Sequence, residues 1–312
     1  MNKLAICFSG QGSQYEGMAL DFIENHKPSF DLVTDISNQL GFNFIDKYKH
    51  SDYKKTDEVQ LMIVLKSMLG LYALNVQDYK VDGYFGFSLG VFTAYYASGI
   101  FNLYDTLNIV KIRGDYMQKA SLETKGKMAA IIGLNKPMIL DTIKPLQQIG
   151  TIEIANENHD KQYVISGQKD LVEKAVVLLK AKGARRSVLL QVSGAFHTSL
   201  MNEAAKSFVK ETKVFKKHKM HTPMLMNVDG LWLNEEDIDI HLKQQMTSPV
   251  KFIDMVNTLK NDGFTHVLEI GPKKVLTSFI KKIDKDIDVM SFDHFNELEN
   301  VERWLLVNGF KK

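Results

Sequence analysis

The sequence predicts an α/β protein, in which a smaller subdomain is inserted into a large subdomain built on a mostly parallel sheet. Apolar runs of strand length alternate with helical patterns along most of the 312 residues, as is typical of a parallel sheet covered by helices. Residues 124–195 instead show the order strand, helix, strand, strand, helix, strand. A serine between two glycines, where an apolar run meets a helical pattern, predicts a reactive site in the large subdomain.

The composition is that of a globular protein with a sizeable core, since 45% of the residues are hydrophobic and the formal net charge is +2. This charge gives no reason to expect nucleic-acid binding, although lysines cluster within 216–219, 273–274 and 281–282 and could meet an acidic protein. The single cysteine, Cys7, lies in an apolar run, so we expect no disulfide and a reducing cytoplasm. No apolar run approaches the ~20 residues of a membrane span, and the first strand begins too early for a signal peptide.

A glycine-rich loop follows the first expected strand, Leu4–Phe8. Gly10, Gly12 and Gly17 do not have the spacing of a dinucleotide-binding loop, and no phosphate-binding motif ending in Gly-Lys-Ser/Thr occurs. What remains is a set of backbone amides at a strand end, in residues 9–14, that can donate hydrogen bonds to an oxyanion.

The segment Gly86-Phe-Ser-Leu-Gly90 fits the pattern G-x-S-x-G, which places a serine on a sharp turn between a strand and a helix. Small flanking residues let the backbone bend, and the turn exposes the Ser88 hydroxyl at the carboxyl end of a strand. The first N–H groups of the next helix point toward negative charge that develops beside this hydroxyl. We therefore expect Ser88 to be a nucleophile.

Two helices are expected on either side of the serine segment. Residues 56–72 are apolar nearly all round, which predicts a helix buried against the sheet. A second helix begins near 102–105, and Arg113 lies at the edge of its apolar stripe. A buried guanidinium needs a partner, which is either a carboxylate of the protein or a carboxylate of a ligand.

The inserted subdomain has the order of a ferredoxin-like βαββαβ unit. Its expected elements are strand 128–132, helix 136–148, strands 151–155 and 162–166, helix 169–182 and strand 186–192. The predicted domain limits are therefore 124–195 for the small subdomain, and 1–123 with 196–312 for the large catalytic subdomain.

The loop 193–198 carries His197, which we expect to act as a base because the chain re-enters the large subdomain there, where two subdomains should form a cleft. His221, which opens the apolar run 222–228, is the competing candidate. No acidic residue lies near His197 in the sequence, and the spacing of acids and histidines predicts no metal site.

The last third alternates between strands and helices, which places the site at the carboxyl ends of the strands. The expected elements are strand 223–228, helix 239–245, a break at 246–249, helix 251–260, strand 265–270, a loop at 271–274 and a further helix.

With these segments in place, the chain resembles the malonyl-CoA:acyl carrier protein transacylase family, the acyltransferases of fatty acid and polyketide synthesis, nearly from end to end. The resemblance implies a large α/β-hydrolase-like subdomain and a small ferredoxin-like one. The matching segments are Gly10–Gln14, Gly86–Gly90, Ile112–Gly114, Met128–Gly133, Val192–His197, Asn227–Asp229, Gln245–Val250 and Glu269–Pro272.

The resemblance implies transfer of a malonyl group from malonyl-CoA to the phosphopantetheine thiol of an acyl carrier protein, through a malonyl-serine intermediate. It implies no metal and no cofactor other than the coenzyme A thioester. The implied roles are Ser88 as the acylated nucleophile, His197 as the base, the amides of Gln11 and Leu89 as the oxyanion hole, the backbone carbonyl of Gln245 as the group that orients the imidazole, Arg113 as the clamp for the malonyl carboxylate, and Phe196, Phe87 and Asn227 as substrate contacts.

Two residues depart from the family pattern: Phe87 stands where a histidine is usual, and Val91 where a glutamate is usual. The first departure predicts altered pocket polarity, and with it altered acyl selectivity. The alternatives are a transferase serving a polyketide system, a serine thioesterase or hydrolase using Ser88 and His197, and a non-catalytic scaffold that binds the carrier protein. Malonyl-CoA and the carrier protein are the expected partners, without nucleic acid or membrane, and a monomer is the default state.

Overall fold

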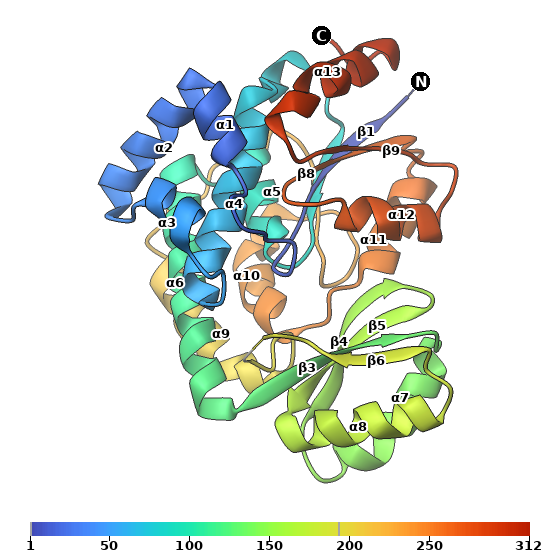
Figure 1. The fold of residues 1–312 in the computed structure, drawn as a ribbon. Coiled ribbons are helices and arrows are strands. Elements are labelled where there is room, and N and C mark those ends of the chain that lie inside the picture. The colour runs from blue at the N-terminus through green and yellow to red at the C-terminus, as the bar shows by residue number, and fades with distance from the viewer. Residues whose placement is uncertain (1, 193) are drawn as a thin grey trace. The chain divides into compact units, whose positions relative to one another are not determined.

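The computed structural model describes residues 2–192 and 194–312, which divide into two compact units (Figure 1). The first unit comprises the chain up to Gly114 together with 215–225 and 259–312. The second unit comprises 115–214 and 226–258.

The first unit is built on a five-stranded sheet of order β7-β2-β1-β8-β9, in which every pair of neighbours is parallel. Its strands are β1 (Leu4–Phe8), β2 (Gly83–Gly86), β7 (Met224–Leu225), β8 (His266–Ile270) and β9 (Asp288–Phe292). Buried apolar side chains fill β1 and β8 almost continuously, as expected of strands covered on both faces. Because the strands are parallel, the loops after β1, β2 and β8 leave the sheet at one edge.

Helices cover this sheet. They are α1 (Leu20–Asn25), α2 (Lys27–Leu40), α3 (Phe44–His50), α4 (Thr56–Ala73), α5 (Gly90–Ala97), α12 (Val275–Ile283) and α13 (Leu298–Val307), with short 3-10 turns at Val76–Asp78 and Phe295–Glu297. Helices α6 (Leu103–Thr124) and α11 (Phe252–Asn261) each begin in one unit and end in the other. As predicted, α4 is buried nearly all round, and it packs against α5 and β8.

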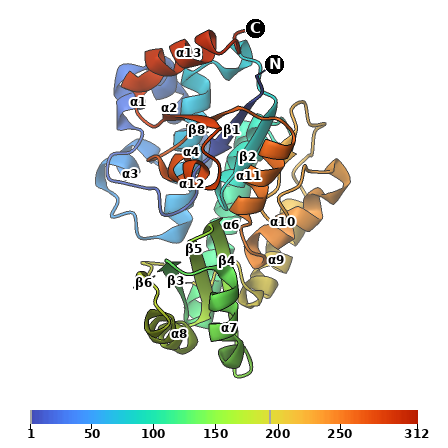
Figure 2. The same cartoon turned by 90° about the vertical axis from the view of Figure 1, so that its right-hand side faces the viewer.

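The second unit contains an antiparallel sheet of order β4-β5-β3-β6. Its elements are β3 (Gly126–Ile132), α7 (Lys136–Gln147), β4 (Ile152–His159), β5 (Gln162–Gln168), α8 (Lys169–Ala181), β6 (Arg186–Leu189), α9 (Asn202–Thr212) and α10 (Ile238–Thr247), with 3-10 turns at Ser199–Met201 and Glu235–Asp237. Helices α7 and α8 lie on one face of the sheet (Figure 2), where Ile139 and Val172 pack with Ile131 and Ile165 of the strands. This arrangement confirms the predicted fold class.

Several expected elements differ in extent. The strand predicted at 223–228 is only Met224–Leu225, because the chain then turns: Gly230 N–H donates to the Met226 carbonyl, and Met226 N–H to that of Leu231. The second unit also includes 196–214 and 226–258, which the sequence assigned to the large subdomain, so the domain limits stay a prediction. Helices α2, α3, α9 and α13 and strand β9 had not been predicted.

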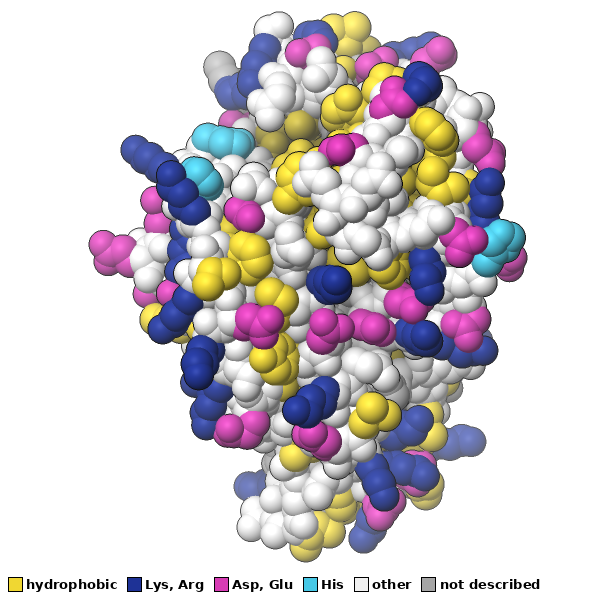
Figure 3. Space-filling model, turned by 90° about the vertical axis from the view of Figure 1, so that its left-hand side faces the viewer, with side chains coloured by type: hydrophobic (Ala, Val, Ile, Leu, Met, Phe, Trp, Pro, Cys, Tyr) yellow, Lys and Arg dark blue, Asp and Glu magenta, His cyan; other side chains and the backbone are white. Residues whose placement is uncertain are grey.

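The surface in Figure 3 shows Lys and Arg side chains interspersed with Asp and Glu instead of gathered by sign. This mixture agrees with the formal net charge of +2. Among the described residues, no helix combines the length and the apolar character that crossing a lipid bilayer requires.

Candidate active site

The turn between β2 and α5 presents Ser88, as the sequence predicted. Ser88 has a φ of 50°, in the left-handed region that non-glycine residues rarely adopt, and α5 begins two residues later. Gly90 N–H donates to the Phe87 carbonyl at 2.9 Å, which closes the turn. Backbone strain of this kind persists only where the surroundings enforce it, and it is common at functional sites.

Close backbone packing explains the glycines on either side of Ser88. A Cβ added to Gly86 would overlap the backbone of Gly90, and a Cβ on Gly90 would overlap the carbonyl oxygen of Phe8 at the end of β1. A third close approach occurs at Gly10, where a Cβ would overlap the Phe87 carbonyl oxygen. The loop after β1 therefore packs directly against the nucleophile turn.

Residues 9–17 form this loop, which we call the oxyanion loop after the role predicted for the Gln11 amide. Gln11 follows the contact at Gly10, and Leu89 is the N-cap residue of α5, at the end of a helix where backbone N–H groups lack intrahelical acceptors. Ser13 N–H and Oγ both donate to the Gly10 carbonyl, at 3.3 and 2.7 Å, and hold the loop in a tight turn. This geometry supports the predicted roles of the Gln11 and Leu89 amides, which remain a prediction.

Arg113 of α6 is buried, with 1% of its surface exposed. Its Nη1 donates to Oε1 of Gln60 at 2.7 Å, and its guanidinium carbon lies 5.5 Å from the centre of the Phe92 ring. Burial lowers the pKa of Arg113 to about 9, so the side chain is still a cation at neutral pH. A desolvated guanidinium of this kind attracts carboxylates strongly.

Gln60 of α4 is a site residue that the sequence analysis missed. Its Oε1 accepts from Arg113, and its Nε2 donates to Oε1 of Gln11 at 3.4 Å, so one amide links the guanidinium to the oxyanion loop. Gln60 is fully buried. An isolated amide in the apolar run of residues 59–65 was the signal that could have identified it, since buried amides are kept for their hydrogen bonds.

Phe87 contributes an apolar wall beside the nucleophile. Its ring lies 6.3 Å from that of Phe279 in α12, with an interplanar angle of 52°, and it is partly buried. The ring also flanks Gly10 of the oxyanion loop. A residue of this type removes the hydrogen-bonding capacity that a histidine would bring to this position.

In the second unit, His197 is held by two backbone carbonyls. Its N–H donates to the Met246 carbonyl at 3.0 Å, and its Nδ1 contacts the Ser248 carbonyl at 3.1 Å. A carbonyl can only accept, so Nδ1 carries the proton and the neutral ring keeps its lone pair on Nε2. His197 is buried and has a φ of 60°, so its ring is fixed by strained backbone as well.

The sequence assigned this orienting role to the carbonyl of Gln245, whereas the contact described here comes from Ser248; the role of Gln245 stays a prediction. Gln245 lies in the last turn of α10. Ser248 follows the helix and precedes Pro249, which disfavours helical backbone in the residue before it. Its extended conformation, φ −113° and ψ 156°, directs the carbonyl to the imidazole.

The two remaining predicted contacts, Phe196 and Asn227, are also buried in the second unit. The Phe196 ring packs so closely on Gly194 that a Cβ there would overlap it, while Ser193 lies outside the described residues. The Asn227 carbonyl accepts from Lys251 N–H at 2.7 Å. The Asn227 side-chain amide has no hydrogen-bond partner among the described residues, which is costly for a buried group unless a ligand supplies one.

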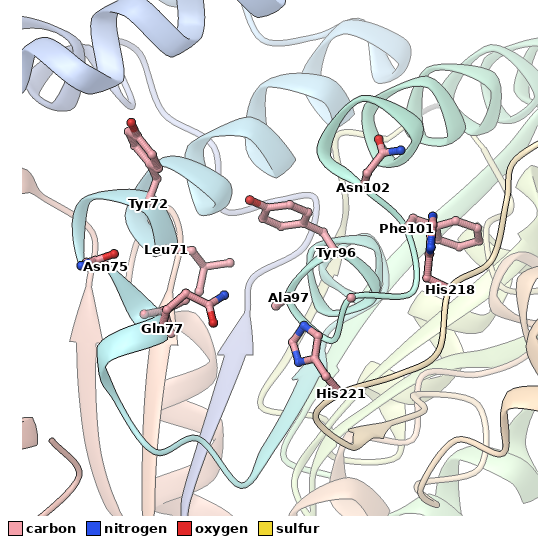
Figure 4. A pocket seen from close by; sticks show the side chains of 12 residues that line it. Leu71, Tyr72, Asn75, Gln77, Tyr96, Ala97, Phe101, Asn102, His218 and His221 are labelled. Carbon is pink, nitrogen blue, oxygen red and sulfur yellow. The ribbon is translucent and has the colours of Figure 1, made fainter. Parts of the chain in front are cut away.

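The competing base, His221, lies elsewhere in the first unit. It lines a pocket of about 480 Å³ that contains none of the predicted site residues (Figure 4), and its ring packs on Gly99 just after α5. Ser88 precedes the other end of this eight-residue helix, which is about 12 Å long. His221 is therefore too far from Ser88 to take its proton. No group of three or more potential metal ligands occurs within 2–192 or 194–312.

Comparison with known proteins places these features in a family. The model of the acyl transferase domain family matches residues 6–297. A malonyl CoA-acyl carrier protein transacylase of Staphylococcus aureus is 34% identical over 309 residues, covering 97% of this chain and 99% of its own. The crystal structure of the enzyme of that name from Clostridium perfringens is 32% identical with a TM-score of 0.92, covering 98% of both chains.

A third relative is a malonyl-transacylase solved in complex with a type II PKS acyl-carrier protein. It is 28% identical with a TM-score of 0.93, over 97% of this chain and 99% of its own. Fold, nucleophile turn and end-to-end similarity agree, and this chain belongs to the acyl transferase domain family.

Proposed function

We propose that this chain transfers the malonyl group of malonyl-CoA to the phosphopantetheine thiol of an acyl carrier protein, through a malonyl ester of Ser88. The observation that carries the proposal is the presence, in one compact unit, of a strained nucleophile turn and a buried guanidinium linked by Gln60 to the oxyanion loop. The names of the relatives support the same reaction.

In the first half-reaction, Nε2 of His197 takes the proton of the Ser88 hydroxyl while Oγ bonds to the thioester carbon. The carbonyl oxygen becomes an oxyanion that accepts from the N–H groups of Gln11 and Leu89. When the intermediate collapses, the carbon–sulfur bond breaks and the leaving thiolate takes the proton from Nε2. Coenzyme A then departs and the malonyl ester remains on Ser88.

The second half-reaction reverses these steps with a different thiol. His197 removes the proton of the phosphopantetheine thiol, whose sulfur attacks the ester carbon, and the same amides stabilise the second oxyanion. Collapse breaks the bond to Oγ, and Ser88 recovers its proton from His197. The Ser248 carbonyl keeps the imidazole in the required tautomer in both halves, so no acidic partner is needed.

Arg113 supplies selectivity for malonyl over acetyl thioesters. Its planar guanidinium can donate two parallel hydrogen bonds to the malonyl carboxylate, and in a buried site that pair is strong. An acetyl group has no carboxylate to offer the guanidinium, so acetyl-CoA should bind less tightly than malonyl-CoA. Phe196, Phe87 and Asn227 complete the proposed substrate contacts.

The test is intact-mass analysis after brief mixing with malonyl-CoA. The unaltered protein should gain one malonyl group, and Ser88→Ala should gain none. Release of free coenzyme A in step with malonate, without any acceptor, would favour the thioesterase alternative. Absence of an adduct on the unaltered protein would contradict the proposal.

The carrier protein could belong to fatty acid or to polyketide synthesis, and we infer fatty acid synthesis because most of the named relatives carry the general transacylase name. A relative that was solved with a type II PKS carrier keeps the polyketide alternative open. Transfer rates to a purified carrier of each kind will decide between them.

We also infer that the enzyme works as a monomer in a reducing cytoplasm and that it needs no cofactor besides the thioester. The support is the single buried cysteine and the presence of all the proposed chemical groups in one chain. Light scattering coupled to gel filtration, together with activity after exhaustive dialysis against a chelator, tests these points. A dimer mass or a loss of activity on dialysis would overturn them.

A further inference from the structure

A buried ionic cluster lies beside the oxyanion loop and plays no part in the proposed chemistry. Lys66 of α4 is fully buried, and its ammonium donates to the backbone carbonyl of Asp293, lies 3.8 Å from the Asp293 carboxylate and stands 4.0 Å from the centre of the Phe22 ring. Asp293 follows β9 and is only 4% exposed. These two groups are therefore largely removed from water.

Stability does not explain this pair. Burial lowers the pKa of Lys66 to about 8, even though Asp293, Asp21 and Glu297 all act to raise it. Folding thus works against the charged form of this lysine. Because desolvation of a buried ion pair often exceeds the attraction within it, an apolar side chain at position 66 would serve the core at least as well.

The carboxylate of Asp293 joins the oxyanion loop to the loop that follows β8, at the carboxyl ends of the strands. Its Oδ1 accepts from the Tyr15 hydroxyl at 2.9 Å, and its Oδ2 accepts from Lys273 N–H, in the loop after β8, at 2.8 Å. Tyr15 belongs to the oxyanion loop, four residues after Gln11. Asp293, in the loop after β9, therefore holds the loops that follow β1 and β8.

Helix α4 is connected to the oxyanion loop at two points, once directly and once through Asp293. Gln60 holds the side chain of Gln11, and Lys66, six residues later, holds Asp293 and through it Tyr15. Other ties are a hydrogen bond from Ser9 Oγ to the Pro272 carbonyl at 3.3 Å and one from Gly17 N–H to the Tyr53 hydroxyl at 3.1 Å. Loss of the Tyr15 contact should therefore loosen the loop without releasing it.

We propose that Lys66, Asp293 and Tyr15 are positioning residues that fix the oxyanion loop, so that the Gln11 amide is held where the oxyanion forms. This inference rests on the proposed function. None of the three side chains is assigned a contact with substrate, and they act through the loop backbone. Preorganised donors of this kind stabilise the transition state and contribute little to the binding of the ground state.

The test uses the full-length chain and compares Tyr15→Phe, Lys66→Met and the double variant. The rate constant for malonylation of Ser88 is measured by rapid quench and intact mass across malonyl-CoA concentrations. Small displacements of catalytic groups cost one to two orders of magnitude, so we expect about a tenfold lower maximal rate for each single variant. The half-saturating concentration should change less than about twofold, since substrate binding is not the affected step.

The double variant should be no slower than the slower single variant, because both substitutions break the same connection. Tyr104→Phe is the matched control: its hydroxyl donates to the carboxylate of Asp35, the same kind of contact but without any residue of the oxyanion loop, and its rate should equal that of the unaltered chain. Tyr15→Phe removes a single oxygen, so it keeps the test valid even where Lys66→Met perturbs folding.

Three results would overturn the inference. The first is an unchanged maximal rate in both single variants, and the second is a double variant in which the two rate reductions multiply. The third is a change in the half-saturating concentration without a change in the maximal rate. An unaltered chain that forms no adduct would overturn the proposed function, and this inference with it. An unaltered chain that is acylated at the same rate as the variants would overturn this inference alone.

Discussion

Replacing Arg113 with methionine tests the proposed carboxylate clamp separately from the nucleophile, the base and the oxyanion hole. Methionine removes the charge and keeps an unbranched side chain, which limits the cavity left in the core. Because burial lowers the pKa of Arg113 to about 9, the folded protein holds this cation at a cost in free energy, and its removal should leave the chain folded. The unfolding midpoint of the variant checks this expectation.

The size of the effect follows from the burial of the guanidinium. Removing one partner of a buried, hydrogen-bonded charge pair costs about 2–5 kcal/mol. At about 1.4 kcal/mol for each factor of ten, kcat/KM for malonyl-CoA should fall roughly 30-fold to several thousandfold. Acetyl-CoA offers no carboxylate, so its kcat/KM should change by less than about fivefold.

The assay is competitive acylation of Ser88 by the two thioesters, read as malonyl and acetyl adducts in one mass spectrum. Arg113→Lys is the matched control, since it keeps the charge but not the planar pair of donors. Its kcat/KM for malonyl-CoA should lie between those of the unaltered chain and Arg113→Met. Equal losses for malonyl and acetyl transfer would refute the assignment of Arg113 as the carboxylate clamp.

Three further predictions concern the framework. Burial lowers the pKa of Lys66 from its ordinary value of 10.5 to about 8, so the folded state loses this proton at a lower pH than the unfolded state. The free energy of unfolding of the unaltered chain, relative to that of Lys66→Met, should therefore rise by about 2 kcal/mol between pH 7.5 and 9.5 in urea titrations. A difference that does not change with pH would contradict the burial of a charged lysine. Gly90→Ala should destabilise the fold by more than about 3 kcal/mol because its Cβ would overlap the Phe8 carbonyl, and a smaller loss would show that the turn can relax. Pro249→Ala should lower the acylation rate and populate both imidazole tautomers of His197 in ¹⁵N spectra, since the Ser248 backbone is no longer confined; a single unchanged tautomer would argue against control by this carbonyl.

Local signals made much of the fold predictable. The strand of residues 4–8 is a continuous apolar run, and the turn at Ser88 depends on two glycines whose close contacts leave no room for a side chain. The order of elements between 126 and 189 was sufficient to predict a ferredoxin-like sheet. In each case the pattern of residue types within a short window determines the structure.

The groups that sequence reasoning missed depend on distant contacts or on the backbone. Lys66 and Asp293 are 227 positions apart, and nothing near either residue indicates the other. Every residue has a backbone carbonyl, so residue type gives no sign of which carbonyl orients His197. Only the backbone conformation before Pro249 distinguishes Ser248 from Gln245. Gln60 lies in a helix without a polar face, where periodicity gives no sign of which side chain points to the site.

That helix, α4, has a consequence for how the enzyme can change over evolution. Gln60 and Lys66 project from one rigid rod, so a rotation or axial slide of α4 would move the support of the guanidinium and the support of Tyr15 at the same moment. Core substitutions around α4, distant from both groups, would then change acyl preference and turnover together. Lineages that retune one trait by repacking around α4 should carry compensating changes that restore the other.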